Sequence, residues 1–241
     1  MINEDLELSN IEKNIVIIPA AGLGQRFGSE TPKQYLKING TMILDATLNI
    51  FLHSDLFEKI ILIISPEDQL YKTLDNISNE KLIVIDGGQE RQNSVNNGLR
   101  YLYDNGLPDD TPVLVHDAVR PCVAISDINL LLEEFELTKQ ACFLAERITD
   151  SLKKIDLDNN VIESVPRDDL IHALTPQMAK FIDLKYAISS IIKNDIHVTD
   201  EVTALIDYDL PVKAVIANHP NPKITIEKDL VLAENLILKN S

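Results

Sequence analysis

The stretch of sequence best suited to chemistry is Pro19–Gly28 together with Thr31–Tyr35, which follow the apolar run Ile15–Ile18. Its small residues let backbone N–H groups approach an anion closely. Two cations, Arg26 and Lys33, stand beside those small residues. In an open α/β sheet, ligands bind beyond the carboxyl ends of the strands. The combination predicts a phosphate-binding loop, whereas the glycines alone would indicate only a surface turn.

Two other kinds of glycine loop fit this segment less well. The P-loop pattern GxxxxGK[ST] does not occur in it. A dinucleotide-binding GxGxxG would need a third glycine where Phe27 follows Gly22 and Gly24, and Gly28 comes one position late. A nicotinamide-dependent oxidoreductase is therefore disfavoured.

Further polar blocks stand at intervals along the chain, several of them after apolar runs. They are Asp86–Ser94, His116–Pro121, Asp150–Lys153, Ser164–Arg167, His172–Gln177, Val198–Glu201 and Asn221–Thr225. Several of them also have a purely structural interpretation. Ser94 and Thr199 have the chemistry of helix N-caps, and Asp117 with Arg120 could form an ion pair that steadies a loop. We interpret His172 as a packing residue, and Asp200 with Glu201 as no metal site.

The elements that must position these blocks follow from the alternation of apolar runs and helical patterns. The predicted strands are Ile15–Ile18, Ile60–Ile64, Leu82–Ile85, Val113–Val115, Ala141–Ala145 and Val212–Ile216, and the predicted helices are Ile43–Leu52, Arg91–Tyr103, Ile128–Leu137, Met178–Ile192, Asp200–Ile206 and one from Glu227. Continuous apolar strands that alternate with helices predict an α/β fold: a Rossmann-like, mainly parallel sheet with helices on both faces.

Residues 146–169 break this pattern. Two short alternating runs, Leu152–Ile155 and Val161–Val165, flank the turn-rich segment Asp156–Asn160. They predict a projecting β-hairpin with little core of its own. Because an isolated hairpin is marginally stable in water, it would pack either on a partner chain or on its own domain. Residues 14–238, with 146–169 as a protruding arm, are predicted to form one domain. A mobile or loosely packed extension, residues 1–13, precedes it.

Composition excludes several function classes. The net charge of −16 argues against nonspecific nucleic-acid binding, and it requires local cations wherever a phosphate is to bind. The longest apolar run has strand length, so we expect no membrane-spanning helix. Cys122 and Cys142 form no CxxC pair, which indicates neither a metal cluster nor a disulfide framework and favours a reduced, cytoplasmic setting.

The order and spacing of these blocks resemble the 2-C-methyl-D-erythritol 4-phosphate cytidylyltransferase family, from non-mevalonate isoprenoid synthesis. The motif Pro19–Arg26 followed by Pro32–Tyr35 carries the resemblance, which extends over about residues 14–238. It implies a nucleotidyltransferase fold, and transfer of CMP from CTP to a small sugar-alcohol phosphate with release of pyrophosphate. It also implies Mg²⁺ or another divalent cation on the CTP phosphates, with no protein ligand assigned to it. The hairpin arm would make a homodimer.

The resemblance assigns roles to particular residues. Catalytic roles fall to Arg26, Lys33 and Lys223. Nucleotide binding falls to Pro19, Ala20, Ala21, Gly22, Gly24, Gly88, Gln89, Arg91, Ser94 and Asp117. Acceptor binding falls to Asp117, Arg120, Ser151, Arg167, Thr175, Thr199 and Lys223, with Arg167 reaching across from the partner subunit.

Two alternatives remain open from the sequence. Ribitol-5-phosphate cytidylyltransferases share the fold and most motifs, but more often have a second glycine where Ala21 stands. A non-catalytic, nucleotide-binding regulatory homologue would be expected to lose Arg26, Lys33 or Lys223, and all three are present.

Overall fold

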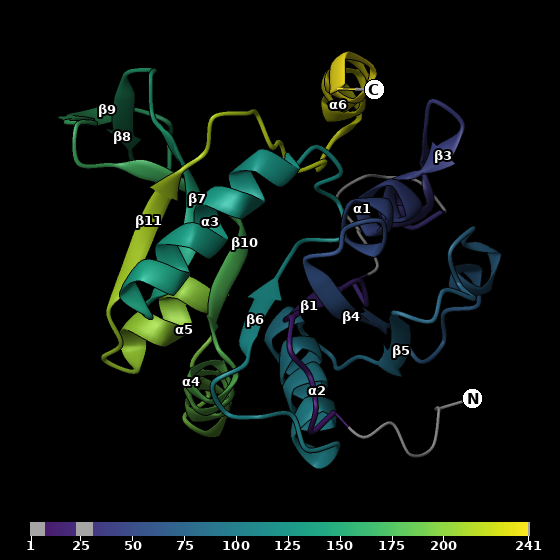
Figure 1. Ribbon diagram of the computed structural model, residues 1–241. Helices are drawn as coiled ribbons and strands as arrows, with labels where there is room; N and C mark the ends of the chain where they lie inside the picture. The colour runs from purple at the N-terminus through teal and green to yellow at the C-terminus, as the bar shows by residue number, and fades with distance from the viewer. Residues whose placement is uncertain (1–7, 23–30, 241) are drawn as a thin grey trace.

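A seven-stranded sheet runs through the centre of the protein (Figure 1), whose computed structural model describes residues 8–22 and 31–240. The strand order is β11-β7-β10-β6-β1-β4-β5. These strands are β1 Asn14–Pro19, β4 Phe57–Ile64, β5 Leu82–Asp86, β6 Pro112–Val115, β7 Ala141–Arg147, β10 Ile171–Lys180 and β11 Val212–Ile216. Every neighbouring pair is parallel except those that β10 makes with β6 and β7. The predicted mainly parallel sheet is confirmed.

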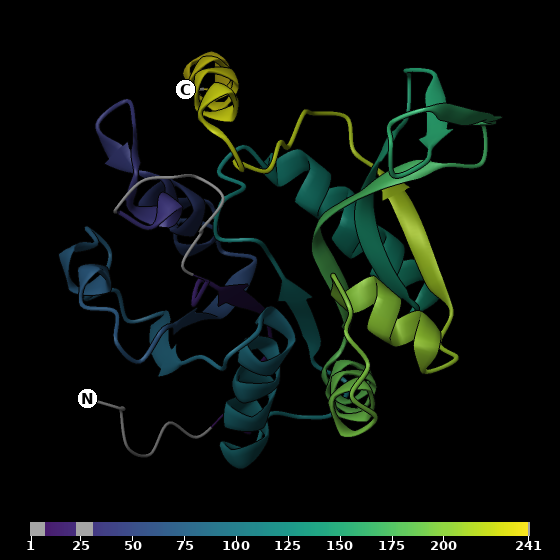
Figure 2. The same ribbon diagram turned by 180° about the vertical axis from the view of Figure 1, so that it is seen from behind.

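Helices cover both faces of the sheet, as Figures 1 and 2 show from opposite sides. Helices α1 (Ile43–Leu52) and α3 (Ile125–Thr138) pack on one face, and α2 (Arg91–Asp104), α4 (Phe181–Lys193) and α5 (Glu201–Asp207) pack on the other. Helix α6 (Glu227–Asn240) packs against the small hairpin of β2 (Lys37–Ile38) and β3 (Thr41–Met42).

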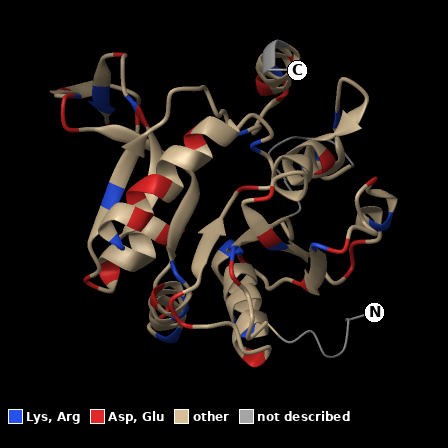
Figure 3. Ribbon diagram, viewed as in Figure 1, with Lys and Arg blue, Asp and Glu red and all other residues tan. Residues whose placement is uncertain are grey.

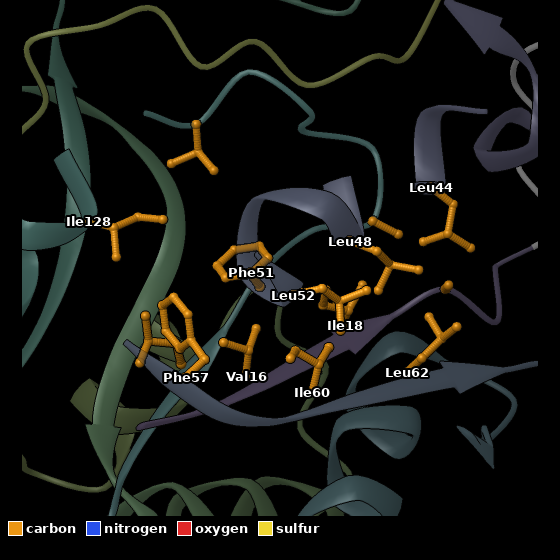
Figure 4. Packing of buried hydrophobic residues seen from close by; sticks show 14 of the residues in the cluster. Val16, Ile18, Leu44, Leu48, Phe51, Leu52, Phe57, Ile60, Leu62 and Ile128 are labelled. Carbon is orange, nitrogen blue, oxygen red and sulfur yellow. The ribbon is translucent and has the colours of Figure 1, made fainter. Parts of the chain in front are cut away.

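The apolar side chains of the central strands fill both interfaces, which explains why these strands are hydrophobic throughout. Figure 4 shows one of them, where Leu48 and Phe51 of α1 face Ile18 and Ile60 of the sheet. The rings of Phe51 and Phe57 meet edge to face, with centroids 5.2 Å apart. The strand ends that carry the polar blocks are therefore held on a rigid core.

Strand β10 corrects the sequence prediction. The polar block His172–Gln177 lies outside every predicted strand, and the next helix was expected to begin at Met178. Instead, both lie in β10, and α4 begins at Phe181. The pairing of β10 with β7 is irregular between Ala173 and Gln177, around Pro176. A proline cannot donate to a sheet ladder, so it argues against a strand in sequence and is tolerated here at the irregularity.

The hairpin projects from the sheet as a separate two-stranded unit made of β8 (Leu152–Ile155) and β9 (Val161–Val165) (Figure 1). This arm leaves four apolar side chains more than half exposed: Ile155, Leu157, Val161 and Ile162. The hairpin prediction is confirmed.

The segment before β1 packs on the domain where the structure describes it, contrary to the expectation of a loose extension. Leu8 is buried in the core, and its N–H donates to the carbonyl of Asn105 at 2.9 Å. The N–H groups of Glu12 and Lys13 donate to Glu58 Oε2. In Figure 3, acidic and basic residues lie along helices, loops and strands throughout the ribbon. No helix in residues 8–22 and 31–240 combines the length and apolarity needed to cross a bilayer.

Candidate active site

A cleft opens where β1, β5 and β6 end, at the carboxyl edge of the parallel part of the sheet. Its described lining comes from five separate segments of the chain. The residues are Pro19, Ala20, Ala21, Gly22, Lys33, Gln34, Gly88, Gln89, Glu90, Arg91, Ser94, Asp117, Ala118, Val119 and Lys223. The fold thus gathers polar blocks that lie up to 204 positions apart in sequence, from Pro19 to Lys223.

The first loop is held by a glutamine from the short 3-10 turn Lys33–Tyr35. Gln34 is buried, and its Nε2 donates to the carbonyls of Ala20 at 3.0 Å and Gly22 at 3.3 Å. On the far side of the turn, the Tyr35 hydroxyl donates to Asp68 Oδ2 at 2.6 Å. Lys33 therefore stands on a turn that is fixed at both sides.

The second block packs tightly against the first. The N–H of Gly87 donates to the carbonyl of Ile64 at 2.7 Å. A Cβ on Gly87 would lie 2.6 Å from the Cβ of Ala21, so only glycine fits there without a shift. Ser94 lies within α2, where its Oγ accepts from the Gly88 N–H and donates to the carbonyl of Glu90, both at 3.1 Å. Ser94 is thus neither a cap nor a surface residue, and it fixes the Gly87–Gly88 turn.

Asp117, at the end of β6, is surrounded by three cations. Its carboxylate oxygens lie 3.0 Å from Lys223 Nζ, 3.2 Å from Arg120 Nε and 3.4 Å from Arg91 Nη2. Burial alone would raise the pKa of Asp117, but the charges of Arg91, Lys223 and Arg120 hold that pKa well below its usual range. Asp117 is therefore ionised at neutral pH and organises the cations around it.

Glu201 supports the site without lining the cleft, and the sequence prediction missed it. It is 1% exposed and accepts two bonds from Arg91, with Nη1–Oε1 at 2.6 Å and Nη2–Oε2 at 2.9 Å. Burial would lower the pKa of Arg91, but the charges of Glu201 and Asp117 raise it above its ordinary value. This forked pair joins the start of α2 to the start of α5. The residues are 110 positions apart, so no local pattern in the sequence points to the pair.

Comparisons with known proteins agree with one another. The family model described as "IspD: 2-C-methyl-D-erythritol 4-phosphate cytidylyltransferase" matches residues 14–239. A relative of that name from Colwellia psychrerythraea is 40% identical over 237 residues, which are 95% of this chain and 96% of the relative. One from Pseudoalteromonas atlantica is 39% identical over 220 residues, 91% of this chain and 93% of the relative. This chain belongs to the 2-C-methyl-D-erythritol 4-phosphate cytidylyltransferase family.

Solved structures support the same assignment. The crystal structure of the Francisella tularensis 2-C-methyl-D-erythritol 4-phosphate cytidylyltransferase is similar to this chain with a TM-score of 0.80 and 36% identity. The similarity covers 93% of this chain and 100% of that one. A structure of a 4-diphosphocytidyl-2C-methyl-D-erythritol synthase has a TM-score of 0.81 at 27% identity, covering 93% of this chain and 99% of that one. The nucleotidyltransferase fold of the family is therefore that of this chain.

With the cytidylyltransferase family established, the predicted site residues divide into three groups. Those that line the cleft are Pro19, Ala20, Ala21, Gly22, Lys33, Gly88, Gln89, Arg91, Ser94, Asp117 and Lys223. Those outside its lining are Arg120, Ser151, Arg167, Thr175 and Thr199. Gly24 and Arg26 lie outside the described residues. The lining residues that were not predicted, Gln34 among them, flank predicted ones in the same motifs.

The second group is spread over distinct places. Arg120 is buried beneath the cleft, where its Nη1 donates to the carbonyl of Asn221 at 2.6 Å. Thr175 is buried in the middle of β10. Ser151 and Arg167 are exposed where the chain enters and leaves the arm, and Arg167 donates to the carbonyl of Thr149. Within one chain, the predicted acceptor residues are therefore not all brought together.

Two local predictions are wrong. Thr199 was expected to cap α5, but the cap is Asp200, whose Oδ1 accepts from the Thr203 N–H at 3.0 Å. The reason is register: Asp200 takes the extended backbone conformation of the N-cap, and Thr199 lies one position too early. His172 was interpreted as a packing residue, yet its side chain is 59% exposed on β10.

Proposed function

We propose that this chain transfers a cytidylyl group from CTP to 2-C-methyl-D-erythritol 4-phosphate and releases pyrophosphate. The observation that carries the proposal is the convergence of both glycine-rich blocks, Lys33 and Lys223 on one cleft organised by Asp117. The names of the relatives favour methylerythritol phosphate over ribitol phosphate as acceptor.

The chemistry needs positioned charge rather than a protein nucleophile. An acceptor phosphate oxygen, already anionic at neutral pH, forms a bond to the α-phosphorus of CTP. The bond from that phosphorus to the bridging oxygen breaks, and its electron pair leaves with pyrophosphate, so no proton has to be removed. The protein must bring two anions together and stabilise the charge that develops at phosphorus.

The cleft supplies this charge despite the strongly acidic chain. Among its described lining residues, the cations Lys33, Arg91 and Lys223 outnumber the acids Glu90 and Asp117. Lys223 is half-exposed at the rim, and Asp117 fixes its Nζ at 3.0 Å, so its ammonium is placed in advance for a phosphate. Lys33 faces the same space from the 3-10 turn. We assign both lysines, with Arg26, to stabilisation of the transition state.

The divalent cation of this proposal is carried by the substrate. Among the residues that the structure describes, no three His, Cys, Asp or Glu side chains are grouped to hold a metal ion. The negative charge of Asp117 in the cleft is already balanced by the three cations that lie around it. The donor set therefore fits Mg²⁺ held by the triphosphate oxygens, where it would neutralise charge on the departing pyrophosphate.

Lys33→Ala tests the assignment. Removing one preorganised charge contact of this kind costs about 3 kcal/mol, so we expect kcat/KM to fall about a hundredfold with an unchanged melting temperature. The matched control is Lys37→Ala, an exposed lysine on β2 outside the cleft lining. Pyrophosphate release is measured with CTP and either acceptor, with and without Mg²⁺. Near-wild-type turnover by Lys33→Ala would refute the role of Lys33, and preference for ribitol 5-phosphate would refute the acceptor.

A homodimer through the arm is part of the proposal. The four exposed apolar side chains of the arm support it, because a two-stranded hairpin with such a surface needs a partner. Ile162→Lys should give a monomer by size-exclusion chromatography with light scattering. Leu137→Lys, at an even more exposed apolar position on α3, is the control and should leave the dimer intact. A dimeric Ile162→Lys variant would argue against the arm as interface.

Arg167 of each subunit is assigned to the acceptor phosphate that binds in the cleft of its partner. Subunit mixing tests this assignment, because Lys33→Ala and Arg167→Ala would each be inactive alone. If Arg167 acts across the dimer, a mixed dimer contains one complete site and activity returns on co-expression. No recovery in verified mixed dimers would mean that both residues serve the same chain's site.

A cytoplasmic location completes the proposal, supported by the free, buried thiols of Cys122 and Cys142.

A further inference from the structure

A buried histidine, His116, stands one residue before Asp117 and does not line the cleft. It is fully buried, and its ring meets Phe51 edge to face with centroids 5.1 Å apart. Its Nε2 lies 3.1 Å from the carbonyl oxygen of Arg120, and its Nδ1 lies 3.0 Å from the Oγ1 of Thr175. Both ring nitrogens are thus engaged by groups next to the site.

These partners determine which nitrogen carries the proton. A carbonyl oxygen only accepts, so Nε2 of His116 must be the donor to Arg120. In the neutral ring Nδ1 is then an acceptor, and the Thr175 hydroxyl must donate to it. The Thr175 oxygen is left to accept from the Asp117 N–H, at 3.2 Å. Every bond in this chain has a donor and an acceptor, and burial lowers the pKa of His116 to about 4, which keeps the ring neutral.

The same bonds continue to Lys223. The Nδ2 of Asn221 donates to the carbonyl of Thr175 at 2.7 Å, and Arg120 Nη1 donates to the carbonyl of Asn221 at 2.6 Å. Lys223 follows Asn221 by two residues and pairs with Asp117. The network therefore ties the end of β6, the middle of β10 and the segment before α6 into one unit.

We infer that His116 is a positioning residue for the transfer reaction: as a neutral Nε2–H imidazole, it orients the Thr175 hydroxyl and so fixes Asp117, Arg120 and Lys223 against one another. The inference rests on the proposed function for its kinetic consequences. The residues that it fixes are all assigned to the acceptor, and of these Asp117 is assigned to the nucleotide as well. The cytosine-side block of Gly88 and Ser94 makes none of these bonds. The effect of His116 should therefore fall on the acceptor more than on CTP.

Two substitutions separate the two ring nitrogens. Asparagine places its amide near the position of Nδ1 and can still accept from Thr175. Glutamine reaches the position of Nε2 and can still donate to Arg120. We expect His116→Gln to lower kcat/KM for the acceptor about tenfold or more, because a misoriented group next to the reacting atoms is costly. His116→Asn should lose clearly less. His172→Gln, the same change at an exposed site on β10, should behave as wild type.

Further measurements distinguish positioning from packing. The affinity for CTP, measured by calorimetry without turnover, should change less than about threefold in both variants. Thr175→Val removes the hydroxyl at nearly constant shape, and its effect should not add to that of His116→Gln. If the losses of activity from His116→Gln and Thr175→Val add fully in the double variant, the orienting role is refuted. It is also refuted if both variants lose activity toward CTP and toward the acceptor in proportion to their loss of stability.

The wild-type protein offers a test that needs no variant to fold. Long-range ¹H–¹⁵N NMR of histidine-labelled protein reports the tautomer of each ring, and we expect a neutral Nε2–H form for His116 at pH 7. An Nδ1–H tautomer or an imidazolium would overturn the inference. Failure of the proposed function would look different, because wild-type protein would then release no pyrophosphate from CTP and the acceptor while the tautomer remained as inferred.

Discussion

Replacing Glu201 by glutamine tests how strongly the buried pair between α2 and α5 stabilises the fold. The structure provides an ion pair of equal length as a comparison. Arg91 Nη1 and Glu201 Oε1 are 2.6 Å apart, as are Lys180 Nζ and Asp110 Oδ1. The Glu201 side chain is 1% exposed, whereas that of Asp110 is 82% exposed. Distance is therefore constant between the two pairs, and burial differs.

The expected losses follow from that difference. Removing one partner of a buried ion pair destabilises a protein by about 3–5 kcal/mol, because the remaining charge is left without compensation. Arg91 is partly exposed and keeps Asp117 at 3.4 Å, so we expect a loss of about 2–3 kcal/mol for Glu201→Gln. The exposed pair contributes at most about 1 kcal/mol, so Asp110→Asn should lose that much or less.

Urea unfolding followed by circular dichroism, at one protein concentration and two salt concentrations, measures both losses. For a chain of this length the loss at Glu201 corresponds to about 4–12 °C in melting temperature. Salt should reduce only the contribution of the exposed pair, because the buried pair is little screened. Equal losses for Glu201→Gln and Asp110→Asn would refute the argument from burial, as would a Glu201 effect that disappears at high salt.

Three further predictions concern the site and its support. Gly87→Ala, whose new Cβ would meet the Cβ of Ala21 at 2.6 Å, should weaken CTP binding at least about tenfold by calorimetry, and unchanged affinity would contradict the packing argument. Gln34→Leu should raise KM for CTP with little change in the melting temperature, because the substitution leaves the carbonyls of Ala20 and Gly22 without their donor. A lower melting temperature with an unchanged KM would contradict this. The pKa of His116 falls from 6.5 to about 4 on folding, so the unfolded chain binds more protons between these values. The free energy of unfolding should therefore decrease by about 3 kcal/mol as pH falls from about 6.5 to about 4, and His116→Asn should remove that part of the pH dependence in urea titrations.

Strand β10 shows where sequence patterns stop being informative about the fold. The other six sheet strands are apolar runs bounded by polar residues, and their local pattern predicts them. In β10 the run from Leu174 to Ala179 is buried, yet it contains Thr175, Pro176 and Gln177. These residues are accommodated because β6 and β7 flank them on both sides, and the Gln177 amide donates to Asp200. That support comes from residues distant in sequence, so no window of sequence contains it.

The candidate site divides in the same way. Glycines and lysines at strand ends were predictable, because their chemistry toward phosphate is a property of the residue types themselves. Glu201, His116 and Asn221 were not, because each matters only through a partner elsewhere in the fold. The partners of Glu201 and His116 lie 110 and 59 positions away. Asp200 was missed as a cap for a smaller reason, a shift of one residue that composition cannot distinguish.

The two ends of the arm join the central sheet at neighbouring residues, so the arm can be deleted without breaking the sheet. The chain leaves β7 at Arg147 and returns to β10 at Ile171, and these two residues face each other in the antiparallel register. Paired residues of this kind lie about 5 Å apart, a gap that a two-residue turn such as Asn-Gly closes. Residues 148–170 can therefore be replaced by such a turn without altering any strand of the central sheet. The sheet would keep its cleft, and the shortened protein would separate what the nucleotide site does alone from what the arm adds.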